Sequence, residues 1–211
     1  PVDSEGLKYY KHILFQATYN MEEILIPTEI TVIAGGAFMG HNELKSVVLS
    51  DRLKSIGEYA FSGCSKLYNM AIPETVRYIG SSAFSNCKSL ENISIPENIT
   101  HIYGNTFENC EKFQYIELPQ GLEYIGKEAF KGCTLIKNTL IPKNVKQIDD
   151  GAFSLCINLE NVEFEGEPLY IGNSFYDTKY YNSIKEDKYS CKYIGNHLIE
   201  LVDKKRGKVI I

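Results

Sequence analysis

The sequence predicts a single solenoid of seven stacked turns, with β-hairpin elements at both ends. Three observations support this fold. A phrase such as "YIGSSAFSNCKSLENISIP" returns at a fixed period, each copy holds a short apolar alternation, and two segments near the ends share another apolar rhythm. A period of roughly 20 to 50 residues is typical of stacked repeats, in which each turn covers the apolar face of the next.

A phenylalanine sets the register of the repeat. Six phenylalanines stand 23 residues apart and a seventh follows after 22: Phe38, Phe61, Phe84, Phe107, Phe130, Phe153 and Phe175. A cysteine stands three residues after five of them: Cys64, Cys87, Cys110, Cys133 and Cys156. Because stacking brings equivalent positions together, we expect the phenylalanines to form a continuous buried spine. One turn cannot bury its apolar side chains alone, so the core is a property of the array.

A half-buried strand follows the phenylalanine in each turn. Apolar residues alternate with outward ones, as at Ile93 and Ile95, and Thr139 is the single polar residue at an inward position. This alternation predicts a strand with one face in the core. In the part of each turn that follows this strand and leads back to the next phenylalanine, which we call the return leg, an isoleucine marks a second inward position. A glycine often follows it, and for these glycines we expect a tight turn with positive φ: Gly57, Gly80 and Gly126.

The two segments near the ends, His12 to Ile26 and His197 to Ile211, have equal length and the same apolar rhythm. Each is predicted to form a β-hairpin of two strands around a polar turn. We therefore divide one domain, residues 1–211, into an N-terminal hairpin (1–26), the repeats (27–175), and an insertion with a C-terminal hairpin (176–211). Because the chain begins at Pro1, we expect it to be an excerpt or a processed product.

Composition narrows the classes of partner. The formal net charge is -5, and a nucleic-acid partner usually requires a basic stripe, so none is expected. No run of about 18 apolar residues occurs, so we expect no membrane insertion by this segment. We also find no motif typical of an enzyme or a cofactor site, and we expect neither catalysis nor a cofactor.

The ladder cysteines could be free thiols, disulfides or metal ligands. Metal sites usually hold two ligands close together on one loop, and no such spacing occurs. Thiols on stacked turns run parallel, which does not suit disulfide geometry. We favour a buried ladder of free thiols, with Cys191 outside it and without an evident partner. The four histidines show no metal spacing and are expected to be structural or on the surface: His12, His41, His101 and His197.

The pattern L-x-x-I-x-I-P followed by L/V-x-x-I-G-x-x-A-F-x-x-C, over roughly residues 24–175, resembles the BspA-like (Treponema-type) leucine-rich repeat proteins. The resemblance implies an α/β, right-handed leucine-rich repeat solenoid with a parallel sheet on its concave side. Such proteins are mostly secreted or on the surface of bacteria and some protists, are associated with adhesion and protein binding, and share no catalytic residues. The implied location is extracellular or at the cell surface.

Outward strand residues are the candidate partner-binding site on the concave face: Asn69, Asn92, Tyr115, Asn138, Asn161, Ser94 and Glu117. One interpretation is a recognition surface with Tyr115 as an aromatic anchor. The other is that asparagines bond to each other along the stack, as Asn138 with Asn161 or Asn69 with Asn92. The two are compatible.

The function favoured at this point is a non-enzymatic extracellular binding or adhesion module, a monomer, whose partner is a protein or glycan on another cell or matrix. The alternative is a structural spacer or repeat scaffold segment of a larger surface protein. A fragment of an enzyme is a third possibility, and a fold alone does not decide between them.

Overall fold

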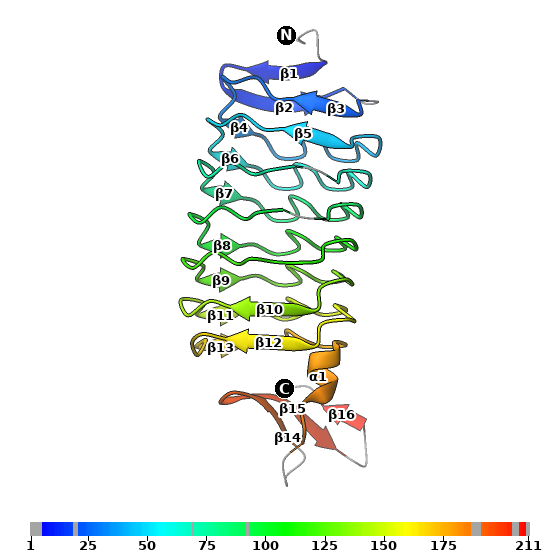
Figure 1. The fold of residues 1–211 in the computed structure, drawn as a ribbon, viewed down its shortest axis with the longest axis vertical. Coiled ribbons are helices and arrows are strands. Elements are labelled where there is room, and N and C mark those ends of the chain that lie inside the picture. The colour runs from blue at the N-terminus through cyan, green and yellow to red at the C-terminus, as the bar shows by residue number, and fades with distance from the viewer. Residues whose placement is uncertain are drawn as a thin grey trace.

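The computed structural model describes residues 6–18, 21–68, 70–91, 93–186, 191–203 and 207–209. These residues form an elongated stack of coils that runs from β1 at one end to the strands β14–β16 at the other (Figure 1). The seven predicted turns and their parallel strands are confirmed. The helical part is small: α1 (Lys179–Ser183) is the one helix in the described part of the chain, and it follows the last turn.

Short strands on one side of each turn form what we call the back face. It begins with the longer strands β1 (Leu7–Tyr10) and β2 (Ile13–Ala17). Two-residue strands continue it at 23-residue intervals: β4 (Val32–Ile33), β6 (Ser55–Ile56), β7 (Tyr78–Ile79), β8 (His101–Ile102), β9 (Tyr124–Ile125), β11 (Gln147–Ile148) and β13 (Tyr170–Ile171). In each two-residue strand the isoleucine is buried and the residue before it points outward.

The strand after each phenylalanine belongs to another side of the stack, which we call the front face. There β3 (Glu23–Leu25) pairs in parallel with β5 (Ser46–Val48), and β10 (Asn138–Ile141) pairs in parallel with β12 (Asn161–Phe164). The turns between them keep the alternation, since Ile93 and Ile95 are buried while Ser94 is exposed. The predicted inward and outward positions are confirmed here.

Stacked phenylalanine rings hold the turns together. From Phe38 to Phe175, neighbouring ring centroids lie 4.9 to 5.5 Å apart and the ring planes differ by 14° or less. All seven rings are buried. Paired parallel strands lie about 4.8 Å apart, so stacked rings have the spacing that the backbone imposes. The predicted spine is confirmed.

Glycine serves two different purposes in the turn. A Cβ on Gly80 would lie 2.5 Å from the backbone nitrogen of Glu58, one turn earlier, so the neighbouring backbone occupies the place of a side chain. Gly57 and Gly126 are similar, and none of the three has a positive φ, so that expectation is wrong. Positive φ occurs instead at two other positions of the turn. One lies two residues before six of the phenylalanines: Gly36, Tyr59, Ser82, Asn105, Glu128 and Gly151. The other lies two residues after each phenylalanine: Gly40, Gly63, Asn86, Asn109, Gly132, Leu155 and Asp177.

The predicted N-terminal hairpin is wrong in its pairing. Strand β2 pairs antiparallel with β1 and parallel with β4, whereas β3 pairs with β5, so β2 and β3 lie in different sheets. The reason is that Ile13 lies in register with Val32, and Glu23 with Ser46. The segment therefore behaves as one more coil of the stack, and the hairpin that covers it is β1–β2.

The described strands of the predicted C-terminal hairpin pair as expected, and its turn, residues 204–206, lies outside the described residues. Strand β15 (His197–Asp203) pairs antiparallel with β16 (Gly207–Val209), and on its other side with β14 (Cys191–Ile194). Between the last turn and these strands, α1 covers the end of the spine. Its N-cap Thr178 accepts a hydrogen bond from the backbone nitrogen of Tyr181, whose side chain is buried, and donates one to the carbonyl of Phe175. The aromatic insertion therefore closes the array.

The ladder cysteines are free buried thiols. Each thiol donates a hydrogen bond of 3.1 to 3.3 Å to the carbonyl of the phenylalanine one turn earlier, as from Cys87 to Phe61. At the first of these positions the buried His41 takes the place of a cysteine, with Nε2 3.2 Å from the carbonyl oxygen of Ala17. The thiol ladder thus adds a bond from turn to turn. The side chain of Cys191 is outside the described residues.

Truncating a spine residue should weaken the whole array. We expect Phe107→Ala to lower the free energy of unfolding by about 3 to 5 kcal/mol, because it removes a fully buried ring and leaves a cavity between two turns. Urea unfolding followed by circular dichroism measures this loss. As a control, Leu169→Ala, at a side chain that is 83% exposed, should change the free energy by about 0.5 kcal/mol or less. An unchanged urea midpoint for Phe107→Ala would contradict the assigned register.

The ladder thiols should be inert in the folded protein. Burial raises the pKa of the Cys64 and Cys156 thiols to about 12, so at about pH 8 only roughly one in 10⁴ is the reactive thiolate. In a Cys191→Ser variant, Ellman's reagent should label no thiol in the native state and all five after guanidinium denaturation. Rapid native labelling, or fewer than five thiols after denaturation, would contradict the free-thiol ladder.

Candidate partner-binding face

The front face carries the candidate residues in the predicted register. Asn69 and Asn92 lie outside the described residues. The other five candidates are all exposed: Ser94, Tyr115, Glu117, Asn138 and Asn161. The side chain of Tyr115 is the most prominent ring among them, with 63% of its surface exposed. These side chains therefore contribute little to the core and are available to a partner.

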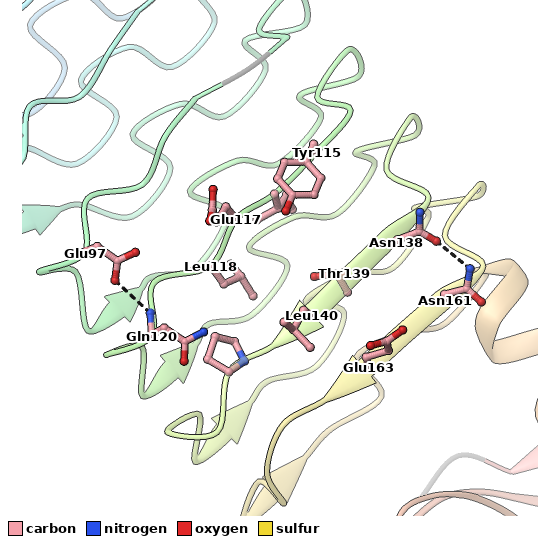
Figure 2. Close-up of a pocket in the computed structure, with 12 residues that line it drawn as sticks. Glu97, Tyr115, Glu117, Leu118, Gln120, Asn138, Thr139, Leu140, Asn161 and Glu163 are labelled. Atoms are coloured by element: carbon pink, nitrogen blue, oxygen red, sulfur yellow. Dashed lines mark hydrogen bonds between the residues drawn. The ribbon is translucent and has the colours of Figure 1, made fainter.

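A hollow of about 290 Å³ lies on the front face over β10, β12 and the two turns before them (Figure 2). Tyr115, Asn138 and Asn161 stand along one part of it, at equivalent positions of three successive turns. Two positions further along the same turns are Glu117, Leu140 and Glu163. Four of the predicted candidates thus line one concave site. Ser94, one turn earlier, is not among its lining residues.

The asparagine ladder is also present where the structure describes it. Asn161 donates a hydrogen bond of 2.7 Å from Nδ2 to Oδ1 of Asn138, and the two residues are paired in the β10–β12 register. This bond fixes the orientation of both amides at the rim of the hollow. The two interpretations of this row are therefore compatible at this pair, because a bond along the stack leaves the side chains exposed.

The charged residues that line the hollow are all acidic. They are Glu97, Glu117 and Glu163. Glu97 accepts a hydrogen bond of 3.2 Å from the backbone nitrogen of Gln120 in the next turn, as Figure 2 shows. Elsewhere in the described residues, glutamates form ion pairs with lysines on adjacent turns, as Glu123 does with Lys146 at 2.6 Å. None of the three glutamates of the hollow takes part in such a pair within this part of the chain.

Thr139 places a polar group where the other turns place an apolar one. Its side chain is 5% exposed, and its hydroxyl has no hydrogen-bond partner among the described residues. Buried unpartnered hydroxyls are rare because they lose hydration without compensation. Thr139 also contributes to the wall of the hollow. The stack therefore carries a buried hydroxyl without a partner directly beneath the candidate site.

The back face carries a second set of rings that the sequence pattern alone did not single out, of which Tyr78 and His101 are exposed and Tyr103 and Tyr124 are half-buried. His101 lies 5.8 Å from Tyr103 and 5.7 Å from Tyr124, measured between ring centroids, and Tyr78 lies 5.5 Å from Tyr103. Burial, followed by the hydrogen bond that Tyr124 donates to Asp149, raises the pKa of Tyr124 to about 12. The sequence signal was available, because Tyr78, His101 and Tyr124 each directly precede a return-leg isoleucine.

The histidines have structural surroundings. His12 Nδ1 lies 2.9 Å from the carbonyl oxygen of Glu29, and His197 Nε2 lies 2.7 Å from that of Pro168. His12, in the turn between β1 and β2, and His197, in β15, thus each connect an end of the array to a neighbouring turn. No group of three histidine, cysteine, aspartate or glutamate residues suited to a metal ion occurs within the described ranges. Over the same ranges, no helix has the length and hydrophobicity needed to cross a bilayer.

Comparison with known proteins identifies relatives of the same architecture. The sequence matches the family model "BspA type Leucine rich repeat region (6 copies)" over residues 8–136 and 100–203. A leucine-rich repeat protein from Bacteroides ovatus ATCC 8483 is similar at 35% identity with a TM-score of 0.66, over 74% of this chain and 41% of that one. The T. pallidum leucine-rich repeat protein TpLRR is similar at 27% identity with a TM-score of 0.75, over 80% of this chain and 81% of that one. A comparison with curated proteins finds no match.

The parallel coils, the buried spine and the exposed front face define a leucine-rich repeat solenoid. The family model spans most of the sequence, and the chain belongs to the BspA-type leucine-rich repeat family. Repeats of this family are scaffolds that typically bind proteins. The chain spans about two fifths of the length of the Bacteroides ovatus protein.

Replacing the unpartnered hydroxyl should stabilise the fold. Thr139→Val keeps the shape of the side chain and removes a buried polar group, so we expect the free energy of unfolding to rise by about 1 kcal/mol. Val47 and Val162 already occupy the equivalent inward position in other turns. Urea unfolding measures the change, with Val162→Thr as the reciprocal control, which should destabilise. A loss of stability in Thr139→Val would show that the hydroxyl has a partner in solution.

Proposed function

We propose that this chain is a non-enzymatic, extracellular or cell-surface binding module that receives a protein or glycan of another cell or matrix on its front face. The observation that carries the proposal is the hollow on that face. Its walls come from four successive turns and include the exposed ring of Tyr115. Binding sites are typically concave, with a few polar groups that fix the orientation of the ligand.

The alternation of buried and exposed residues within each front-face strand supports this proposal. Inward residues such as Ile116 and Leu118 are buried in the core, whereas their neighbours Tyr115 and Glu117 are exposed. The outward row can therefore vary in sequence at little cost to the fold. Tyrosine is also among the residues that contribute most to binding energy at protein interfaces, because its ring is large and has few rotatable bonds.

The state of the cysteines is compatible with a location outside the cell. Oxidising compartments convert accessible thiol pairs to disulfides. The ladder thiols are buried, and burial raises the pKa of each of them above its usual value. Such thiols react slowly, because the thiolate is the reactive form. Together with membership of this family, these features support an extracellular or cell-surface location.

A structural spacer is the second candidate function. It is favoured by the unbroken stack of seven phenylalanine rings and by the Asn138–Asn161 bond, both of which connect successive turns. A stiff rod of this kind could hold another domain away from a surface. A spacer needs no specific partner, and this difference separates the two functions by experiment.

Loss of the front-face anchor should separate binding from folding. We expect a Tyr115→Ala, Asn138→Ala variant to keep the melting temperature of the parent but to lose roughly tenfold or more in affinity, because interface energy concentrates in a few central residues. The measurement is surface plasmon resonance against panels of immobilised matrix proteins and glycans, where the parent should bind at least one. The monomeric state assumed in the fit is checked by light scattering.

The matched control is Tyr170→Ala, which removes a ring that is 47% exposed on the back face. Its affinity should equal that of the parent. If Tyr170→Ala lost affinity while the front-face variant did not, the binding site would lie on the back face. If the parent bound no member of either panel, the spacer function would replace the binding function.

A further inference from the structure

We propose that the front-face hollow receives a lysine or arginine side chain from an extended, basic segment of a protein partner. This inference rests on the proposed binding function and specifies the chemistry of its partner. It commits to a protein ligand, although the broader proposal also admits a glycan. The argument depends on the charges of the hollow, on the spacing of its carboxylates, and on the apolar and polar groups between them.

Charge complementarity is the first step. The hollow has three carboxylates, those of Glu97, Glu117 and Glu163, and none of its lining residues is basic. Several glutamates elsewhere in the described chain are neutralised by a lysine of an adjacent turn, as is Glu22 by Lys45 at 2.7 Å, whereas none of these three is. The negative charge of the hollow is therefore available to a cation from outside. Complementary potentials of this kind increase association rates and exclude wrong partners.

The spacing of two of these carboxylates suits one long cationic side chain. Glu117, Leu140 and Glu163 occupy the same register on three successive turns, and Leu140 is paired with Glu163 across β10 and β12. Turns about 4.8 Å apart place Glu117 and Glu163 on either side of Leu140 with backbones roughly 10 Å apart. Figure 2 shows Glu117 and Glu163 on the two sides of Leu140, so a charged head group held over Leu140 is attracted by both carboxylates.

The uncharged residues explain why the cation belongs to a side chain. Leu140 is 42% exposed between the two glutamates and offers an apolar surface to the methylene stem of lysine or arginine. Tyr115 adds an aromatic ring beside the hollow, and such a ring attracts ammonium and guanidinium groups. A divalent metal ion, by contrast, prefers six or more oxygen ligands at about 2.0 to 2.6 Å and gains nothing from an exposed leucine.

The carboxylates of the hollow accept hydrogen bonds and cannot donate them. Thr139 adds no acceptor to the hollow, because its side chain lies on the buried side of β10 and its hydroxyl is shielded from outside. Lysine and arginine carry several donors and no acceptor, which matches the three carboxylates of the hollow.

The test uses a fluorescein-labelled peptide of alternating arginine and glycine, followed by fluorescence anisotropy at low and at physiological salt. We expect the parent chain to bind this peptide and to ignore its counterparts with glutamate or glutamine in place of arginine. Glu117→Gln with Glu163→Gln should weaken binding roughly tenfold or more, since it removes both carboxylates that flank the head group and preserves their shape.

The matched control is Glu43→Gln with Glu111→Gln. It removes the same total charge from two exposed glutamates that are ion-paired with Lys66 and Lys88 away from the hollow. Its affinity should stay within roughly twofold of the parent. An equal loss in the control would show that the peptide responds only to net charge, and the inference would be wrong. Failure of the parent to bind the arginine peptide would also overturn it.

Two further measurements separate the remaining outcomes. Isothermal titration with calcium alone should give no binding, and calcium binding that displaces the peptide would replace the basic segment by a metal ion. The Glu117→Gln, Glu163→Gln variant is also tested against the partner found by surface plasmon resonance. If that partner is lost with Tyr115→Ala, Asn138→Ala but kept with the glutamine variant, binding at the front face stands and the basic partner is excluded.

Discussion

The stacking of one phenylalanine ring on the next is the constraint on which the rest of this molecule depends. The rings from Phe38 to Phe175 are buried and nearly parallel, and they fill the interior at the spacing of paired parallel strands. Each turn therefore has only one register against its neighbour. Once that register is set, the thiol bonds, the close approach at Gly80 and the alternation of the strand all follow from it.

The same register also positions the residues of the candidate site, because the buried residues of each strand fix where the outward side chains lie. Tyr115 and Glu117 take their places because Ile116 between them is buried. On such a scaffold the repeated turns align their outward residues into one surface. The specificity of that surface comes from the few turns in which the outward residue differs from its equivalents. The inner and outer rows are not fully independent at Thr139. There a polar residue occupies a buried position directly under the hollow of the front face.

Much of this arrangement follows from the periodic part of the sequence. The spine, the strand register and the Asn138–Asn161 bond are visible in it, because equivalent positions must meet in a stack. The pairing of β2 and the role of Gly80 are not visible in the sequence. The pairing of β2 depends on which of the neighbouring strands bonds to its edge. The need for Gly80 depends on the backbone of the turn before it. The hollow is also not predictable from the repeat pattern, because it depends on how far the outward side chains of several turns extend from the sheet. The rings of the back face could have been found, but only by counting outward positions on both legs of the turn.

The hydrogen bond from each thiol to the preceding phenylalanine carbonyl gives the array a direction. Cys87 reaches back to Phe61 and Cys156 to Phe130, so every inner turn donates towards one end and accepts from the other. The chemistry changes at the two ends, where His41 bonds to a carbonyl outside the ladder and Thr178 bonds within its own turn. A gene duplication that added a complete turn in the interior would therefore restore every bond it interrupted, whereas one beyond Thr178 would not.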